Sequence, residues 1–262
     1  MNFTDTHAHL YDPCFATELD MLLERTTEAG VHKIFLPNCD LETVPAMLQL
    51  SARFPNHCFP MIGLHPCYVN ENVAAELAGL KAYLATHSFW AIGEIGLDFY
   101  WDKTFVAQQE AAFREQIGWA KAAGLPIVIH SREATTACLD IIESEGSGTV
   151  PGILHCFSGT VAEAERTVAL GLHLGIGGVV TYKKSNLPDV IRAVGIEHLV
   201  LETDAPYLAP VPYRGKRNES SYIPYIAQAV ADALGLPVAE VARLTTANAE
   251  RIFASVSGSL LP

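Results

Sequence analysis

The sequence predicts an α/β fold, a single (β/α)8 TIM barrel. Short apolar runs alternate with longer amphipathic segments along all 262 residues. Eight such pairs occur, and successive apolar runs begin roughly 25 to 35 residues apart, as in a closed parallel barrel of about 250 residues. Most of the apolar runs are short and continuous, which is typical of parallel strands that are buried on both faces.

The expected elements follow one another along the chain. Strands are predicted at 2–8, 33–37, 58–64, 90–96, 126–130, 151–156, 172–177 and 198–203. Helices are predicted near 18–29, 41–53, 73–86, 105–123, 133–145, 160–170, 186–194 and 222–234, with a last helix at about 238–253. An open doubly wound sheet is the alternative, but the sequence lacks a dinucleotide-binding fingerprint, a phosphate-cradling loop motif and a Pro-, Gly- or Ser-rich linker. We therefore expect one domain over residues 1–262.

Composition narrows the expected location. No basic segment followed by an apolar stretch opens the chain, and no apolar run is long enough to span a bilayer. The six cysteines are dispersed without a Cys-x-x-Cys pair, as in a reduced cytosolic protein. We expect a cytoplasmic protein that uses no membrane and needs no obligate protein partner. The net charge of −12 disfavours non-specific adhesion to nucleic acid, although a local basic patch remains compatible with it.

Potential metal ligands end six of the eight predicted strands. In a parallel barrel, chemistry is located where strands end and loops begin. The six endings contain His7-Ala8-His9, His65-Pro66, Glu94 to Asp98, His130-Ser131-Arg132, His155-Cys156 and Glu202-Thr203-Asp204.

These endings are expected to converge. Residues two apart on a strand share a face, so His7 and His9 can bind one ion. Closure of the barrel makes the eighth strand the neighbour of the first, which brings Asp204 within reach of that ion. The fifth and sixth strands are neighbours too, and they pair His130 with His155. Glu94, on the adjacent fourth strand, can give one carboxylate oxygen to each ion, so the pattern predicts a two-metal centre.

Each of these residues has an ordinary structural explanation when it is taken alone. A histidine at a strand end is more often a hydrogen-bonded core residue than a ligand, and Glu94 could pair with an arginine. Asp204, which precedes Ala-Pro, could be a turn or cap residue. Coincidence of all six residues at matching strand ends is the weaker explanation, because one barrel geometry connects them.

The whole chain resembles the TatD family of metal-dependent hydrolases, deoxyribonucleases of the amidohydrolase-like barrel group. The matching stretches, in order, are DTHAHL, GLHP, GEIGLDFY, QQEAAFREQI, PIVIHSRE, HCFSG, LETDAPYLAP and YRGKRNE. The resemblance implies a 3′ to 5′ exonuclease on single strands whose metals are bound by His7, His9, Glu94, His130, His155 and Asp204, with Glu94 shared. In one departure from the family, Asn218-Glu219 is followed by serine rather than proline, which bears on the last loop rather than on the metals.

A two-metal centre suggests a mechanism. Two ions can activate a water, polarise a phosphoryl oxygen and stabilise the leaving oxygen. Asp204 and Glu94 are the expected catalytic carboxylates, with Asp204 accepting the proton of the water. Imidazole-rich ligation favours two zinc ions per chain, with manganese or magnesium as alternatives.

Basic and aromatic residues gather in two loops of the predicted active face. Tyr182 and Lys183 follow the seventh strand, and Arg214 follows the eighth. Lysine and arginine can hold phosphates, and aromatic rings can stack on unpaired bases, although a solvated polar loop is the alternative explanation. The residues expected to bind substrate, which is a single-stranded DNA end or a short oligonucleotide, are His65, Arg132, Glu202, Tyr182, Lys183 and Arg214.

Three other functions remain open at this point. A cyclic amide or lactone hydrolase is disfavoured, because many such barrels use a carboxylated lysine where this chain offers Glu94. An enzyme that removes the amino acid from transfer RNA would use the same basic loops. A metal-containing barrel that binds nucleotides without turnover differs from these enzymes in one simple assay, the cleavage of an oligonucleotide.

Overall fold

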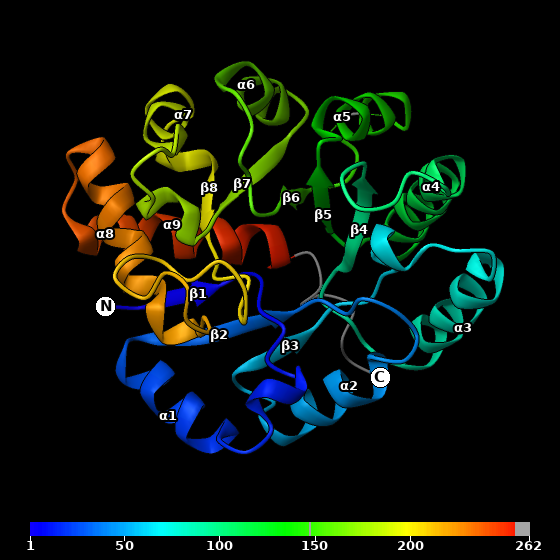
Figure 1. Ribbon diagram of the computed structural model, residues 1–262, viewed down its shortest axis with the longest axis horizontal. Coiled ribbons are helices and arrows are strands. Elements are labelled where there is room, and N and C mark those ends of the chain that lie inside the picture. Colours follow the sequence, from blue (N-terminus) through cyan, green and yellow to red (C-terminus); the bar gives the residue numbers. More distant parts are fainter. Residues whose placement is uncertain (147, 255–262) are drawn as a thin grey trace.

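The computed structural model describes residues 1–146 and 148–254, and it confirms the predicted barrel (Figure 1). The strands are β1 (Phe3–Asp5), β2 (Val31–Leu36), β3 (Cys58–Pro60), β4 (Ile92–Asp98), β5 (Ile127–Arg132), β6 (Gly152–Leu154), β7 (Leu172–Ile176) and β8 (Leu199–Leu201). The helices of the described part are α1 (Leu19–Glu28), α2 (Val44–Arg53), α3 (Val73–Thr86), α4 (Val106–Ala123), α5 (Thr135–Ser144), α6 (Val161–Ala169), α7 (Leu187–Val194), α8 (Ile223–Leu234) and α9 (Val238–Phe253). Residues 255–262, which the predicted domain includes, lie outside the described residues.

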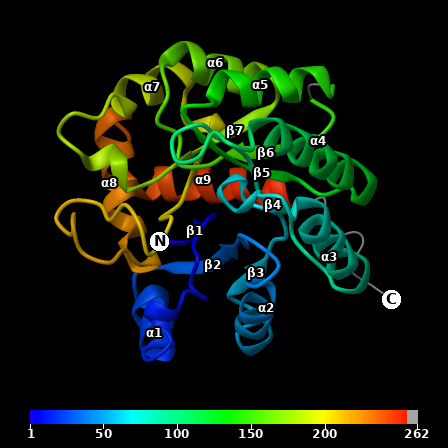
Figure 2. The ribbon, with the colours of Figure 1, turned by 45° about the vertical axis from the view of Figure 1, so that its right-hand side comes forward.

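The eight strands are parallel and form a ring. Continuous pairing gives two sheets, β1-β2-β3 and β4 through β8. Single parallel bridges join them, Ala8 with Ala205 on one side and Ile62 with Ile92 on the other. The amide of Thr6 also donates to the carbonyl of Leu201 at 3.0 Å. Figures 1 and 2 show the helices arranged around this ring.

Several strands are shorter than predicted at the end where the polar residues lie. The first strand is predicted to reach residue 8 and the last to reach residue 203, but regular pairing stops at Asp5 and Leu201. Beyond the pairing, Cys156 and Asp204 have φ values of 47° and 56°. Side chains of L-residues disfavour this left-handed region, so the chain cannot continue as a strand there and turns into the rim.

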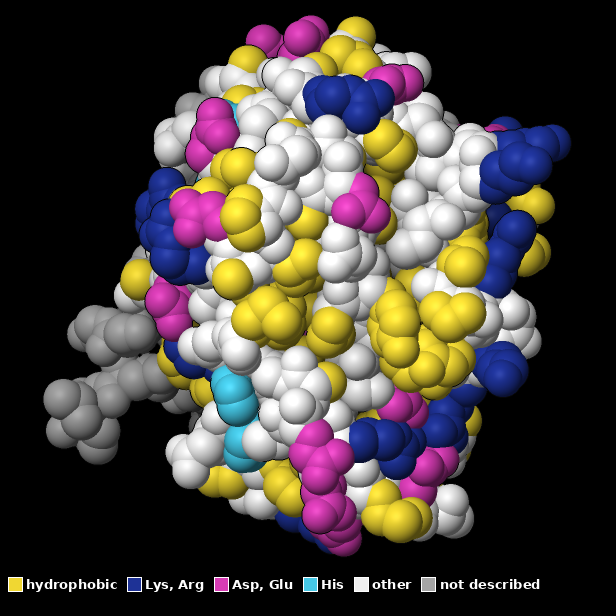
Figure 3. Space-filling model, turned by 90° about the vertical axis from the view of Figure 1, so that its left-hand side faces the viewer, with side chains coloured by type: hydrophobic (Ala, Val, Ile, Leu, Met, Phe, Trp, Pro, Cys, Tyr) yellow, Lys and Arg dark blue, Asp and Glu magenta, His cyan; other side chains and the backbone are white. Residues whose placement is uncertain are grey.

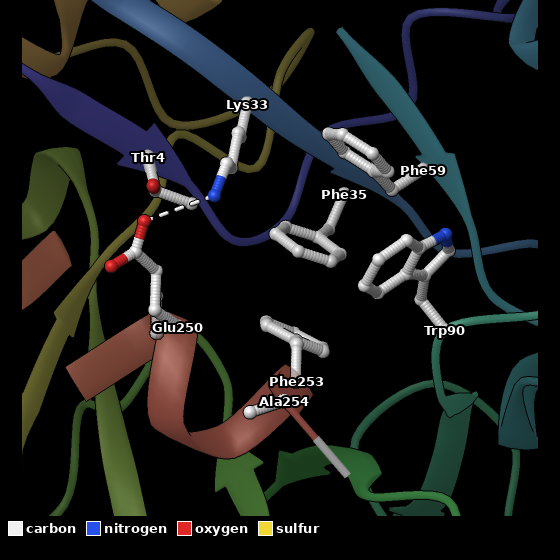
Figure 4. Close-up of a pocket in the computed structure, with 9 residues that line it drawn as sticks. Thr4, Lys33, Phe35, Phe59, Trp90, Glu250, Phe253 and Ala254 are labelled. Carbon is white, nitrogen blue, oxygen red and sulfur yellow. Dashed lines mark hydrogen bonds and ion pairs between the residues drawn. The ribbon is translucent and has the colours of Figure 1, made fainter. Parts of the chain in front are cut away.

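The opposite, amino-terminal end of the barrel is closed by aromatic side chains (Figure 4). Phe253 of α9 stacks on Phe35 of β2 with ring centroids 3.7 Å apart, and Phe59 and Trp90 pack beside them. These rings line a cavity of about 290 Å³, and an ion pair between Lys33 and Glu250 lies beside it. Helix α9 therefore caps the base of the barrel.

Within the described residues, no single helix has the length and hydropathy that crossing a bilayer requires. Only the segment 220–234 together with α9 meets that requirement, and these two pieces are bent by 107° relative to each other.

Candidate metal centre

The carboxyl-terminal rim of the barrel gathers ionisable side chains that are withdrawn from solvent. All six predicted ligands lie here. Four of them follow the ends of β1, β6 and β8, namely His7, His9, His155 and Asp204, whereas Glu94 and His130 lie within β4 and β5. Three overlapping groups have donor atoms within 4.8 Å of one another, namely His7/His9/Glu94, His7/His155/Asp204 and His65/Glu94/His130. The rim is therefore one connected cluster.

Glu94 lies at the centre of this cluster, and its two oxygens face different partners. Oε2 is 3.1 Å from His7 Nε2 and 3.6 Å from His9 Nε2. Oε1 is 2.8 Å from His155 Nε2 and 3.0 Å from His130 Nδ1. A carboxylate placed in this way has the geometry of a bridge between two cation sites.

The donor atoms around His7 and His9 have the spacing of a small tetrahedral metal site. His7 Nε2 and His9 Nε2 are 3.3 Å apart, and Asp204 Oδ1 lies 3.7 Å and 3.5 Å from them. A tetrahedral ion with ligands at 2.0–2.1 Å has ligand-to-ligand edges of about 3.3 Å. With Glu94 Oε2 as the fourth donor, the group has the size and the mixed nitrogen and oxygen chemistry of a zinc or manganese site.

The hydrogen bonds around His9 determine which of its nitrogens is free. Tyr11 donates its hydroxyl hydrogen to the Pro37 carbonyl, an oxygen that can only accept. Its oxygen therefore accepts from His9 Nδ1, 3.0 Å away, which must carry the proton. In this tautomer the lone pair is on Nε2, the atom that faces Glu94 and Asp204. Sequence reasoning missed Tyr11, although it lies two residues after His9.

Asp98 fixes His130 in the same manner. Its Oδ2 lies 2.9 Å from His130 Nε2, which leaves Nδ1 directed at Glu94. Its Oδ1 accepts from the amides of Tyr100 and Trp101. The sequence contained a signal for this residue, because Asp98 is four positions after Glu94 on one strand and therefore shares its face.

His65 lies inside the cluster, but its hydrogen bonds make its Nε2 a hydrogen-bond donor. The Cys67 amide donates to His65 Nδ1 at 3.0 Å, so the proton of neutral His65 is on Nε2. That nitrogen is 3.3 Å from Glu94 Oε1. An N–H group in this position can donate to a carboxylate or to a phosphoryl oxygen.

The structure places Glu202 differently from the substrate contact that we predicted. The residue is fully buried, and its Oε1 accepts from the Cys156 amide and lies 3.4 Å from His155 Nδ1. Gly175 makes this possible, because a Cβ there would come within 2.2 Å of Glu202 Oε2. Glu202 therefore lies behind His155, on the side away from solvent, where it can orient that ring.

Electrostatics keep the central carboxylates ionised. Burial alone would raise the pKa of Glu94, but its interactions with the neighbouring imidazoles, that of His155 first, hold that pKa well below its usual value. Burial likewise opposes ionisation of Asp204, but its hydrogen bond with His9 and the neighbouring imidazoles of His155 and His7 together lower the pKa. Both groups are anionic at neutral pH and available to a cation.

The predicted substrate contacts lie on two sides of the rim. The Arg214 guanidinium carbon is 4.4 Å from the centroid of the Tyr182 ring, so the loops after β7 and β8 touch, and Lys183 is exposed beside them. The Arg132 guanidinium carbon, at the end of β5, lies 4.0 Å from the centroid of the Tyr100 ring. Figure 3, a view of the side that carries α8, shows lysine and arginine side chains along its right-hand margin.

The Asn218-Glu219 motif, which differs from the family pattern in the serine that follows it, lies outside the cluster. Asn218 donates from its side chain to the carbonyls of Thr203 and Tyr207. Glu219 makes a two-pronged ion pair with Arg25 of α1, with both N···O distances at 2.7 Å. These contacts fasten the loop to the barrel.

A (β/α)8 barrel whose rim carries two adjoining groups of histidine and carboxylate donors is the architecture of a metal-dependent hydrolase. Residues 4–254 match the model of a family described as TatD related DNase, and the chain belongs to that family. It is accordingly a metal-dependent hydrolase of the TatD family, as the sequence motifs predicted.

Several relatives are similar over nearly their entire length. The metal-dependent hydrolase YabD of Bacillus subtilis is 37% identical over 95% of this chain and 98% of its own. The 3′-5′ ssDNA/RNA exonuclease TatD of Erwinia tasmaniensis is 32% identical, with 95% and 98% covered. Among solved structures, the TatD homologue YJJV of Escherichia coli superposes with a TM-score of 0.90 and 30% identity, over 96% of this chain and 98% of that one.

Proposed function

We propose that this chain hydrolyses phosphodiester bonds at the 3′ end of single-stranded nucleic acid, with two divalent ions at the rim. The observation that carries the proposal is that the two carboxylate oxygens of Glu94 face different pairs of histidines. Oε2 faces His7 and His9, and Oε1 faces His130 and His155. Two-metal sites of this kind suit in-line displacement at phosphorus.

The donor chemistry supports the metal assignment. His7, His9 and Asp204 would hold one ion, and His130 and His155 would hold the other, with Glu94 between them. Imidazole nitrogens favour zinc first, then manganese, over magnesium, which prefers oxygen ligands. When bound, such ions supply a Lewis acid for the phosphoryl oxygen and lower the pKa of a water.

The protein's own groups have separate tasks. Asp204 is anionic and lies near both His7 and His155, so one of its oxygens can take the proton from the attacking water. His65 presents its Nε2–H to the site and can donate to a non-bridging oxygen of the substrate. Arg132, Lys183 and Arg214 would hold the phosphates that flank the scissile bond.

Two further observations favour a nucleic-acid strand end over duplex. The exonuclease of Erwinia tasmaniensis acts on single-stranded DNA or RNA and is 32% identical to this chain. The net charge of −12 repels a long polyanion, whereas five of the seventeen basic residues lie in the loops 182–184 and 213–217 at the rim. All six cysteines are free thiols, which suits the cytoplasm as the proposed location.

The test is a substrate panel with product mapping. Metal-loaded protein is given 5′-labelled single-stranded DNA, the matching RNA and a duplex, next to aminoacyl-tRNA, model amides and lactones. We expect a ladder that shortens from the 3′ end of single strands, loss of the ladder in His130→Ala, and retained oligonucleotide binding without turnover in Asp204→Asn. Preferred cleavage of an amide or a lactone, or a fully active Asp204→Asn variant, would overturn the proposal.

A further inference from the structure

Exposed aromatic side chains are concentrated at the rim that carries the metal ligands. Among the described residues, the exposed aromatic side chains of that rim are Tyr68 after β3, Tyr100 and Trp101 after β4, and Tyr207 after β8. Tyr225, on α8, is the one other exposed aromatic side chain in the described part of the chain. Trp101 is 68% exposed, a large apolar area to leave in water.

Trp101 belongs to a small cluster with a cationic member. The Arg132 guanidinium carbon lies 5.2 Å from the Trp101 ring centroid and 4.0 Å from that of Tyr100. The two aromatic rings meet edge to face, with centroids 4.9 Å apart. This packing restrains the rings while much of the Trp101 surface stays open, so the cluster is ordered before any ligand arrives.

The same carboxylate fixes this cluster and a proposed metal ligand. Asp98 Oδ1 accepts from the amides of Tyr100 and Trp101, at 2.9 Å and 3.0 Å. Asp98 Oδ2 lies 2.9 Å from His130 Nε2. The position of Trp101 is therefore tied through one side chain to the site where the scissile phosphate would lie.

We infer that Trp101, backed by Tyr100 and Arg132, is a stacking platform for an unpaired nucleobase next to the scissile phosphate. The inference rests on the proposed function and adds a subsite to it. Aromatic platforms accept any base because every base has a π face, and a neighbouring arginine neutralises the adjoining phosphate. A base inside a duplex is already stacked and cannot use the platform, so this subsite also selects unpaired ends.

The inference is tested by removing the ring and the base separately. Fluorescence anisotropy in EDTA, which prevents turnover, measures binding of a labelled hexathymidylate and of the same hexamer with abasic sugars at its last two 3′ positions. We expect wild type to bind the complete hexamer about tenfold more tightly than the abasic one. Trp101→Ala should remove most of this ratio by weakening only the complete hexamer, and Trp101→Phe should keep much of it.

Met21→Ala is the matched control, because Met21 is also an exposed apolar side chain but belongs to α1. It should leave both affinities unchanged. If wild type binds the complete hexamer but discriminates no better than Trp101→Ala, the platform is refuted and the nuclease proposal stands. If wild type binds neither hexamer and the metal-loaded enzyme cleaves no oligonucleotide, both proposals fail together.

Discussion

The two ends of this barrel are built from the same strands, yet they have opposite chemistry. At the amino-terminal end, Phe35, Trp90 and Phe253 pack ring against ring under α9. At the carboxyl-terminal end, Glu94 and its histidine neighbours are almost equally withdrawn from solvent, but they are ionisable. The aromatic end contributes apolar burial, whereas the polar end keeps charged groups out of water, which opposes folding.

This contrast shows which end stabilises the fold and which end performs chemistry. Buried charge raises the free energy of the folded state unless it is compensated, and it is retained where a ligand or a reaction uses it. The polar end is therefore expected to tolerate substitution structurally and to lose activity, and the aromatic end is expected to do the reverse.

The largest expected effect is at Glu94. Glu94→Gln preserves the shape but removes the charge that faces five histidines, so we expect kcat/KM for oligonucleotide cleavage to fall on the order of 10³-fold. The circular dichroism spectrum and cooperative urea unfolding should remain. Activity within tenfold of wild type would show that Glu94 is a structural residue and would remove the contrast.

The complementary change is at Phe253. Phe253→Ala removes a ring that is stacked at 3.7 Å on Phe35, and we expect the free energy of unfolding to fall by about 3 kcal/mol. Because the proposed metal ligands lie at the other end of the strands, kcat/KM at 25 °C should stay within about twofold. Urea denaturation measures the loss of stability, and steady-state kinetics measure kcat/KM. A large decrease of kcat/KM in protein that is still folded would contradict the separate roles of the two ends of the barrel.

A smaller effect concerns His173 on β7, which is not a predicted ligand. Burial, and then the charges of Arg251 and His198, lower the pKa of His173 to about 4. The unfolded chain takes up this proton below about pH 6.5 while the folded chain does not, so the contribution to stability is complete above 6.5 and is lost as the pH falls towards 4.

We expect this residue to account for about 1 kcal/mol of the decrease in unfolding free energy between pH 7.5 and pH 5, after discounting for its partial exposure. His173→Gln should show that much less decrease in urea titrations at the two pH values. An identical pH dependence in variant and wild type would mean that His173 is protonated equally in both states.

The ring of strands and the residues of the rim could be predicted from the sequence, because strand periodicity and a polar residue at each strand end are local signals. The roles of Tyr11 and Asp98 are harder to predict, although both lie close in sequence to a predicted ligand, because which histidine nitrogen each one contacts depends on the orientation of the imidazole ring in the folded chain. The burial of Glu202 could not be predicted either, because alternation along a continuous strand would put its side chain on the same face as that of Asp204. The pairing ends at Leu201, and the left-handed turn at Asp204 lets the two side chains diverge.

Glu94 is proposed to join two cation sites. Counting the bound zinc, by equilibrium dialysis and elemental analysis of stripped and reloaded protein, tests this role. We predict two ions per chain in wild type and, because only His130 and His155 would remain for the second ion without the bridging oxygen, at most one in Glu94→Gln. A single ion in wild type, or two in both proteins, would show that Glu94 does not bridge two cations.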